Sequence, residues 1–505
     1  MDGQLGSTLF APAGTPARAE APAWRRAELV KVFAALLLLT ALLRLPGFFV
    51  DVFNSDETFL ATQAEVIDEG GRLYEEAADR KPPLVPYLYA ATFEVFGTTA
   101  LWSVRVLAMV AVAVTALLLA VEARRRYGQR AGLIAGVLGV LASVAFAPQD
   151  GQAANFEVFM LPSMTAGVLL ARRGKAFSSG VAVALATLAK QTGAATLLPV
   201  LYSIWRTRGR RGASDTLVGF AAPVALVALA VGPGQLLFWA VLGNGSYLGI
   251  RSAWALVALM FFLMTLAFVA LNLPIVWTLP RAWRERRERD DTDLWLWLLS
   301  AAVSVTVGLR FFGHYYLQLL PPLCLLTAGV LASATRRASV RTVALAGVIA
   351  SVFSLCGFFV RPFDRKAEYL STARFIADHS GAEDRILVWG HVPEIYWASG
   401  TRPATRFPTT AFLTGAAGGR EVDDVSEELA TPGAWDLFFA DFLAHPPRFI
   451  LDTSPAAIRG SEYYPISKFP RLAETVFREY RYVSVIDGIT IYERVPHPPF
   501  RTAIW

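Results

Sequence analysis

The sequence contains few charged residues and few cysteines for its length. Of its 505 residues, 17% are charged and 54% are hydrophobic, whereas soluble domains average about 25% charged residues. This composition excludes an ordinary soluble protein. The two cysteines, Cys324 and Cys356, both lie in apolar runs, so the sequence carries no disulfide framework.

Several chemical motifs are also absent. There is no Gly-x-x-x-x-Gly-Lys-Ser/Thr phosphate-binding loop, no His-Glu-x-x-His zinc motif and no cysteine pair at metal-ligand spacing. His314 is the only histidine before residue 361, so a metal site there would need His314 together with carboxylates. No cofactor is certain, and a divalent metal stays an open expectation.

Long apolar runs dominate the first 360 residues. Because a bilayer core of about 30 Å needs about 20 apolar helical residues, hydropathy predicts a polytopic α-helical membrane protein with about eleven transmembrane helices. The predicted spans are 29–50, 99–121, 131–148, 156–171, 176–189, 192–205, 215–232, 253–279, 294–310, 315–335 and 341–360.

The basic residues indicate an orientation, because positively charged short loops stay in the cytoplasm. They recur in every second loop: Arg25-Arg26, Arg124 to Arg126, Arg172-Arg173, Arg206 to Arg211, Arg281 to Arg289 and Arg336-Arg337. We therefore expect a multi-pass protein of the plasma (inner) membrane. Residues 1–28 form a cytoplasmic tail, 29–360 the transmembrane domain and 361–505 an extracytoplasmic C-terminal domain.

The C-terminal domain has the pattern of an α/β fold. Strand-like runs at 385–389 and 448–452 alternate with helical patterns at 366–380 and 421–444, and 482–492 predicts a hairpin turning at Asp487-Gly488. This domain carries 16 basic and 19 acidic residues. The net charge of +6 therefore lies in the membrane half, where topology explains it, and does not indicate a nucleic-acid partner.

The first external loop, 51–98, is acidic, with three basic and ten acidic residues. Amphipathic stretches at 57–70 and 84–97 predict two juxtamembrane helices, the second with aromatic side chains at the lipid boundary. Those aromatic residues are Tyr87, Tyr89, Phe93 and Phe96. Adjacent carboxylates at Asp56 and Glu57 could serve acid–base chemistry; alternatively, Asp56 caps a helix that begins at Glu57.

On this topology, ionisable residues from distant segments gather at the outer membrane face, which suggests a polar cavity. They are Asp56, Glu57, Lys81, Asp150, Glu157, Lys190, Arg310 and His314. Arg80-Lys81 and the stretch from Arg310 through His314 to Tyr315 offer cations, an imidazole and a phenol that suit a phosphate. The alternative is that Lys190 and Arg310 each extend to the interface alone.

These residues resemble those of bacterial GT-C type membrane glycosyltransferases related to protein O-mannosyltransferases and to the aminoarabinose transferase of lipid A. The resemblance covers most of 1–360. Its motifs are Asp56-Glu57, Arg80-Lys81-Pro82-Pro83, Trp102-Ser103-Val104-Arg105-Val106, Glu157, Ala189-Lys190-Gln191-Thr192-Gly193 and His314-Tyr315-Tyr316-Leu317-Gln318-Leu319-Leu320-Pro321-Pro322.

The resemblance implies an inverting transferase that uses a polyprenyl-phosphate-linked sugar on the extracytoplasmic face. Asp56 matches the catalytic base, with Glu57 beside it and Glu157 as a second acid near the donor. Lys81, Lys190, Arg310, His314 and Tyr315 match substrate-binding positions. One departure is Arg80, where the aminoarabinose transferases carry Glu, and this puts a metal site of their type in doubt.

The sequence leaves the substrates open. The donor sugar is a hexose or a pentose, and the acceptor is a lipid, a glycan or a protein. The protein itself is expected to contact membrane lipid. Two other classes remain: a transporter or flippase for a polyprenyl-linked lipid, whose polar residues should lie near the bilayer midplane, and a non-catalytic subunit for cell-envelope assembly, whose acids could be neutralised without loss.

Overall fold

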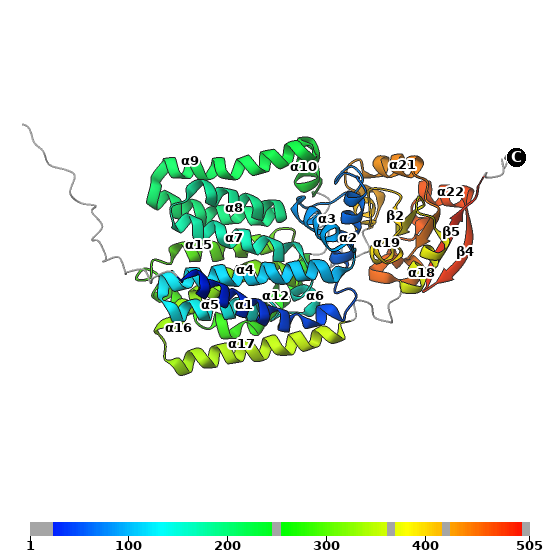
Figure 1. Cartoon of the computed structure of the whole chain (residues 1–505). Helices are drawn as coiled ribbons and strands as arrows, with labels where there is room; N and C mark the ends of the chain where they lie inside the picture. Colours follow the sequence, from blue (N-terminus) through cyan, green and yellow to red (C-terminus); the bar gives the residue numbers. More distant parts are fainter. Residues whose placement is uncertain (1–23, 245–253, 361–368, 417–424, 497–505) are drawn as a thin grey trace, which may run out of the picture.

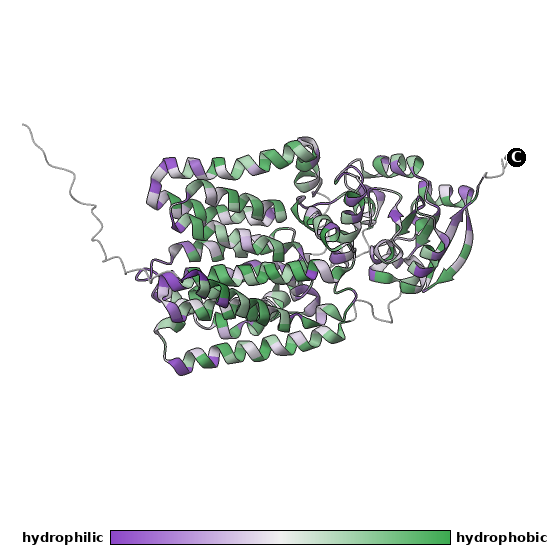
Figure 2. Ribbon diagram, in the orientation of Figure 1, coloured by the Kyte–Doolittle hydropathy of each residue, from purple (hydrophilic) through white to green (hydrophobic). Residues whose placement is uncertain are grey.

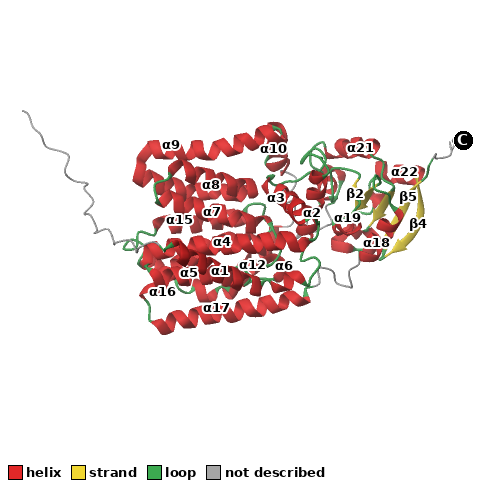
Figure 3. Ribbon diagram, viewed as in Figure 1, coloured by secondary structure: helices red, strands yellow, loops and turns green. Residues whose placement is uncertain are grey.

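The structure, a computed structural model, describes residues 24–244, 254–360, 369–416 and 425–496. Figure 1 shows a bundle of long helices with a smaller unit at one end. The strands of the described residues lie in that smaller unit (Figure 3). The expected tail at 1–28 and the expected helices at 366–380 and 421–444 fall partly outside the described residues.

Ten helices in the described part coincide with the eleven predicted apolar runs, and the number of runs that cross a membrane stays a prediction. The helices are α1 Arg26–Leu43, α4 Leu101–Tyr127, α5 Gln129–Ala142, α7 Phe156–Arg172, α8 Ala176–Ala189, α9 Leu197–Val231, α12 Trp254–Leu271, α15 Thr292–Thr306, α16 Leu320–Ser333 and α17 Arg336–Cys356. Helix α9 contains two spans, separated at Gly209, whose φ of 61° is not helical.

Length and composition agree with a membrane bundle. Five helical stretches in the described part are long and apolar enough to cross a bilayer, and four more apolar helices are shorter. Short elements join them: η2 Gln191–Thr196, α6 Pro148–Gly151, α10 Pro233–Ala240, α13 Leu273–Val276, α14 Leu279–Arg284 and η4 Gly313–Leu319.

Small residues bring α4 and α5 into close contact. Helix α4 ends at Tyr127. The next residue, Gly128, has a φ of 97°, which suits glycine, and the chain turns back at once into α5. A Cβ on Gly132 would lie 2.8 Å from the Ala120 carbonyl oxygen, so only glycine fits there. Such approaches let apolar helices pack where no hydrophobic effect holds them together.

The basic loops meet at the end of the bundle far from the sheet (Figures 1 and 2). Their ion pairs connect segments that are distant in the sequence. Arg126 pairs with Asp293 at 2.6 Å, and Asp290 pairs with both Arg172 at 3.1 Å and Arg206 at 2.5 Å. The basic loops, which are every second loop along the chain, thus lie together in space.

The first external loop folds into α2 Ser55–Asp68 and α3 Leu84–Phe96 at the opposite end. Helix α2 begins at Ser55, because the Asn54 side-chain oxygen accepts hydrogen bonds from the backbone N–H groups of Asp56 and Glu57, at 3.0 and 3.3 Å. The alternative reading of Asp56 as the helix cap is therefore wrong. Asn54 caps the helix and leaves the Asp56 carboxylate available.

The expectation for α3 is half correct. Tyr87 and Phe96 are exposed, but Tyr89 and Phe93 are buried. Their burial has a specific partner, since the Tyr89 hydroxyl donates to the Ala154 carbonyl at 2.7 Å. One side of α3 therefore packs on the loop before α7, and the other remains exposed.

The C-terminal unit contains a five-stranded mixed sheet in the order β2-β1-β3-β5-β4. Its strands are β1 Arg385–Trp389, β2 Arg402–Pro403, β3 Phe449–Asp452, β4 Tyr480–Ile486 and β5 Ile489–Arg494. Strand β1 pairs in parallel with β2 and β3, while β4 and β5 form the predicted hairpin. Its turn has positive φ at both Asp487 and Gly488, as a tight hairpin turn requires.

Helices cover this sheet: α18 Leu370–His379, α19 Glu394–Ser399, α20 Ala411–Thr414, α21 Ala434–Ala444 and α22 Pro470–Glu479. The helix expected at 421–444 begins only at Ala434, after Gly433, which has a φ of 75°. A buried hydrophobic cluster unites this unit with the first external loop and α10. Tyr74, Trp239 and Trp389 are all members of it, so the three regions pack as one body.

Candidate active site

Glu57 is fixed in a buried clamp. Its carboxylate is fully buried and accepts two hydrogen bonds from Arg105, at 2.9 and 2.7 Å. The backbone N–H groups of Phe53 and Ala154 donate to it at 3.0 Å each. With both oxygens occupied, Glu57 holds the loops before α2 and α7 together. This geometry assigns Glu57 a structural role in place of the catalytic role that the sequence predicts.

Arg105 completes the clamp, and sequence reasoning gave it no role beyond a family motif. Besides Glu57, its guanidinium donates to the carbonyl oxygens of Gly47 at 2.8 Å, Val50 at 2.5 Å and Asp51 at 3.0 Å. The only sequence signal for it was a charged residue inside an apolar span. Arg105 thus fixes the start of α2, and with it the position of Asp56.

Asp56, by contrast, remains partly open. Its side chain is 33% exposed and lies 3.8 Å from the Lys81 Nζ, itself 26% exposed. Burial raises the pKa of Asp56, but the nearby cationic groups, Lys81 foremost, outweigh this effect, so the net pKa lies below the ordinary value of 3.8. At neutral pH Asp56 is therefore an ionised, accessible carboxylate among cations.

Lys81 is held by its own loop. Its backbone N–H donates to the Asp79 carboxylate at 3.1 Å, its carbonyl accepts from the Tyr74 hydroxyl at 2.8 Å, and its ammonium lies 4.0 Å from the centre of the Phe156 ring. Asp79 is buried, which raises its pKa to about 6 against the opposing effect of Lys81. These contacts point the ammonium toward Asp56 and α7.

Arg80 does not accompany Lys81. Its guanidinium lies 4.2 Å from the centre of the Phe412 ring and donates to the Ala411 carbonyl at 3.1 Å and to the Thr431 hydroxyl at 3.4 Å. The expectation that Arg80 and Lys81 jointly face a phosphate is therefore wrong. Neighbouring residues point in different directions here, and Arg80 joins the loop to the C-terminal unit.

Glu157, Lys190 and Tyr315 come together from three elements. Glu157 lies at the start of α7, Lys190 at the end of α8 and Tyr315 in η4, and all three are buried. The Lys190 ammonium forms an ion pair with Glu157 and lies 3.7 Å from the centre of the Tyr315 ring. The predicted convergence of these residues is thus present, and Lys190 does not extend to the interface alone.

His314 belongs to the same end of the bundle. Its Nδ1 lies 2.6 Å from the Asp150 carboxylate, which also accepts the His314 backbone N–H at 3.1 Å. Gly313 makes this approach possible, because a Cβ there would lie 2.1 Å from Phe146 and 2.6 Å from Asp150. Arg310 precedes η4, is buried, and sits between Leu309 and Phe311, both with positive φ.

The C-terminal unit adds a residue that the sequence analysis did not assign to the site. The Nε2 of His391 lies 3.4 Å from the hydroxyl of Ser55, the neighbour of Asp56. The sequence signal was faint: a histidine after a glycine at the carboxyl end of a predicted strand. The site is therefore assembled from the first external loop, the bundle and the C-terminal unit.

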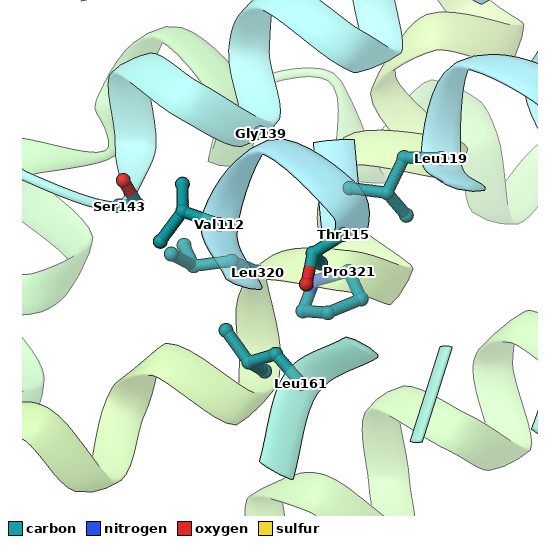
Figure 4. Close-up of a pocket in the computed structure, with 8 residues that line it drawn as sticks. All are labelled: Val112, Thr115, Leu119, Gly139, Ser143, Leu161, Leu320 and Pro321. Carbon is teal, nitrogen blue, oxygen red and sulfur yellow. The ribbon is translucent and has the colours of Figure 1, made fainter. Parts of the chain in front are cut away.

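Within the part of the chain that is described, no group of three or more His, Cys, Asp or Glu residues could hold a metal ion. The cavity in Figure 4 lies inside the bundle among residues such as Val112, Leu161 and Leu320. Its Thr115 hydroxyl donates to the Ala111 carbonyl of its own helix.

Comparisons with known proteins agree with this fold. Residues 80–233 match the family model described as dolichyl-phosphate-mannose-protein mannosyltransferase. ArnT from Cupriavidus metallidurans bound to undecaprenyl phosphate is 14% identical, with a TM-score of 0.63 over 93% of this chain and 99% of that chain. No curated protein sequence matches this chain.

The oligosaccharyltransferase of Archaeoglobus fulgidus is similar as well. Its complex with Zn and sulfate is 14% identical, with a TM-score of 0.55 over 92% of this chain and 73% of that chain. The same organism's AglB, in complex with an inhibitory peptide and a dolichol-phosphate, is 13% identical, with a TM-score of 0.53 over 94% of this chain and 75% of that chain.

These findings show the fold of the protein. The chain is a multi-pass α-helical membrane protein with the GT-C fold and a small C-terminal sheet region. The resemblance to GT-C type glycosyltransferases of the ArnT and protein O-mannosyltransferase kind is confirmed, in the overall fold and in the family model over residues 80–233.

Proposed function

We propose that this protein is an inverting glycosyltransferase. It moves a sugar from a polyprenyl-phosphate donor to an acceptor hydroxyl at the extracytoplasmic face of the plasma membrane. The observation that carries the proposal is the half-open pair of Asp56 and Lys81, 3.8 Å apart. It sets a base beside a cation at the bundle end where buried ionisable residues converge.

Asp56 is the proposed base. It accepts the proton of the acceptor hydroxyl while the hydroxyl oxygen bonds to the anomeric carbon of the sugar. The bond from that carbon to the phosphate oxygen breaks, and its electron pair leaves with the lipid phosphate. A positioned carboxylate suits this task, because it can reach the proton and remains ionised at neutral pH.

Lys81 is the proposed partner of the leaving phosphate. Negative charge grows on the phosphate as the sugar bond breaks, and a fixed ammonium stabilises the transition state more than the bound donor. Arg310 and His314 are further donor-phosphate ligands in this proposal. Glu157, Lys190 and Tyr315 form a buried group that would contact the sugar or its phosphate.

The proposed steps use Asp56 and Lys81 and involve no metal ion. His314 shares its Nδ1 with Asp150, and the Arg80 guanidinium lies over the Phe412 ring. The ligands in the similar structures, undecaprenyl phosphate, dolichol-phosphate and an inhibitory peptide, support a polyprenyl-linked donor. They do not choose among lipid, glycan and protein acceptors.

The proposed reaction can be tested in a deletion strain. Its envelope glycolipids, glycans and glycoproteins should lack one sugar, and purified wild-type protein added to its membranes should restore the transfer. Asp56→Asn protein should not. If the Asp56→Asn protein restores the sugar fully, Asp56 is not the base; this is the result expected of a transporter or an assembly subunit, because neither role needs this carboxylate as a base.

The proposed membrane face has its own test. Alkaline phosphatase, which folds actively outside the cytoplasm, should be active when fused after Phe363. It should be inactive when fused after Arg211, which lies in a basic loop. An inactive fusion after Phe363 at normal expression would place the site on the cytoplasmic face and contradict the proposed orientation.

A further inference from the structure

The C-terminal unit contacts α2 where the proposed base lies. His391 follows β1, and its Nε2 lies 3.4 Å from the Ser55 hydroxyl. Ser55 directly precedes Asp56 in the first turn of α2. A separation of 3.4 Å is long for a hydrogen bond to a hydroxyl, so this contact is loose. A hydroxyl group of a substrate could replace Ser55 as the partner of His391, because only a weak hydrogen bond would be lost.

His391 is held firmly from behind. Its backbone carbonyl accepts a hydrogen bond from the Arg459 guanidinium at 2.6 Å. Arg459 in turn forms a bidentate ion pair with the buried Glu394, at 2.7 and 3.1 Å. The backbone around Arg459 is unusual, since Ala457 and Arg459 both have a φ of 53°. Strained residues of this kind persist where the surroundings over-determine them.

The preceding glycine fixes the direction of the His391 side chain. Gly390 has a φ of 153°, and a Cβ there would lie 1.9 Å from the Thr453 hydroxyl oxygen. Thr453 itself donates to the Trp389 carbonyl at 2.9 Å. No residue with a side chain fits at position 390, so the chain turns sharply after β1 and presents the imidazole to α2.

The protonation state of His391 suits a polar contact with an uncharged group. Burial and the nearby Arg459 lower its pKa to about 4, against the opposing effects of Glu394 and Asp56. A neutral imidazole can donate at one nitrogen and accept at the other. It can therefore hold a hydroxyl without competing with Lys81 for the phosphate.

We propose that His391 is an acceptor-binding residue, which holds the acceptor hydroxyl beside Asp56. This inference rests on the proposed function and extends it, because it assigns the acceptor side of the site to the C-terminal unit. The donor phosphate is then held by the bundle and the first external loop, and the acceptor by the C-terminal unit together with Asp56.

The test separates acceptor use from donor binding. In membranes of the deletion strain, His391→Ala protein should transfer sugar about ten- to hundredfold more slowly than wild type, the effect of one lost hydrogen bond to a substrate. Raising the amount of added envelope acceptor fraction should recover part of the rate, because the acceptor KM rises. Purified His391→Ala protein should bind undecaprenyl phosphate within about twofold of wild type, since its phosphate contacts are intact.

Two matched variants control for structure. His391→Gln, whose amide can also donate and accept, should recover most of the rate. Arg402→Ala removes the ion pair with Glu69, another contact between α2 and the C-terminal unit. Glu69 lies fourteen residues beyond Ser55, about 21 Å along a helix, so this variant weakens docking away from Asp56 and should transfer sugar normally.

Three results would overturn the inference: full transfer by His391→Ala, a parallel loss of undecaprenyl phosphate binding, or an equal loss of transfer in Arg402→Ala. The proposed function fails in a different way. If wild-type protein transfers no sugar, both proposals fall; if wild type transfers sugar and His391→Ala does so equally well, only the role of His391 falls.

Discussion

The two ends of the helical bundle both contain clustered ionisable residues, but the clusters differ in how open they are. The inner cluster, Glu122, Arg126, Asp291 and Asp293, lies at the end far from the sheet. The Arg126 and Glu122 side chains are each 4% exposed, and the two aspartates are each 1% exposed. In the outer cluster, Asp56 and Lys81 are 33% and 26% exposed.

The partners differ in the same way. Arg126 lies within 2.7 Å of both Glu122 and Asp293, so its charge is matched inside the protein. Asp56 and Lys81 are 3.8 Å apart, a distance that leaves room for other partners. Charges that are buried and paired with one another stabilise the fold, whereas charges that are partly exposed can bind a ligand. The exposure and pairing of the side chains therefore distinguish structural from functional charges better than their clustering alone.

The largest expected effect is at Asp56. Asp56→Asn should lower the rate of sugar transfer by about 10²- to 10⁴-fold, the usual contribution of a positioned base, because an amide cannot accept the proton. Unfolding should be unchanged, since Asn54 and not Asp56 caps α2. Transfer assays and thermal unfolding of the purified variant measure both. Transfer at the wild-type rate would show that the open carboxylate is not the base.

A substitution in the inner cluster should lower stability and leave sugar transfer unchanged. Arg126→Ala leaves buried carboxylates without their cation and should lower the free energy of unfolding by about 3–5 kcal/mol. Transfer per folded molecule should stay near wild type. The control is Arg478→Ala, which breaks the exposed pair with Glu474 and should cost less than about 0.5 kcal/mol. A stable Arg126→Ala protein that transfers no sugar would reverse the roles of the two clusters.

Lys81→Ala tests the cation of the outer cluster. Loss of a group that stabilises charge in the transition state lowers the rate by about 10²- to 10³-fold, and binding of undecaprenyl phosphate should weaken as well. Lys468→Ala is a suitable control, because Lys468 contacts only the Tyr463 carbonyl among the described hydrogen bonds and lies in the C-terminal unit. Equal activity of the two variants would assign phosphate recognition to other residues.

The smallest effect concerns pH. Transfer needs ionised Asp56, so the rate should fall as pH drops through the Asp56 pKa, which lies below 3.8. Lys81→Gln removes the foremost of the charges that oppose the effect of burial, so the pKa and the acid limb should move to higher pH. Solvent screens this coupling because Asp56 is one-third exposed. An acid limb of kcat/KM at the same pH in both proteins would show that Lys81 does not act on Asp56.

The sequence predicted the helices and the sheet well, because hydrophobic periodicity and turn residues are local signals. It also grouped residues that the structure brings into contact, such as Asp56 with Lys81 and Glu157 with Lys190, and their role in a site stays a prediction. It could not decide which member of an adjacent pair is open. Glu57 is closed by Arg105, 48 residues away, and Arg80 is drawn to Ala411, 331 residues away. Successive helical residues point about 100° apart, so Asp56 and Glu57 face different surroundings. Only the packing of distant segments decides which of the two carboxylates is buried.

His391 illustrates the same limit over a longer distance. It reaches α2 from 336 residues away, through a turn that depends on Gly390 and Thr453. A single histidine in a soluble-looking segment has no pattern that ties it to a membrane site. The packing of Tyr74, Trp239 and Trp389 in one core brings it there.

The central claim is that the outer, open cluster binds the lipid phosphate of the donor. The most direct measurement is an experimental structure of the protein with bound undecaprenyl phosphate. The account predicts a phosphate oxygen within about 4 Å of the Lys81 Nζ, the range of an ion pair, next to Asp56. A phosphate bound elsewhere, with Lys81 still beside an empty Asp56, would contradict it.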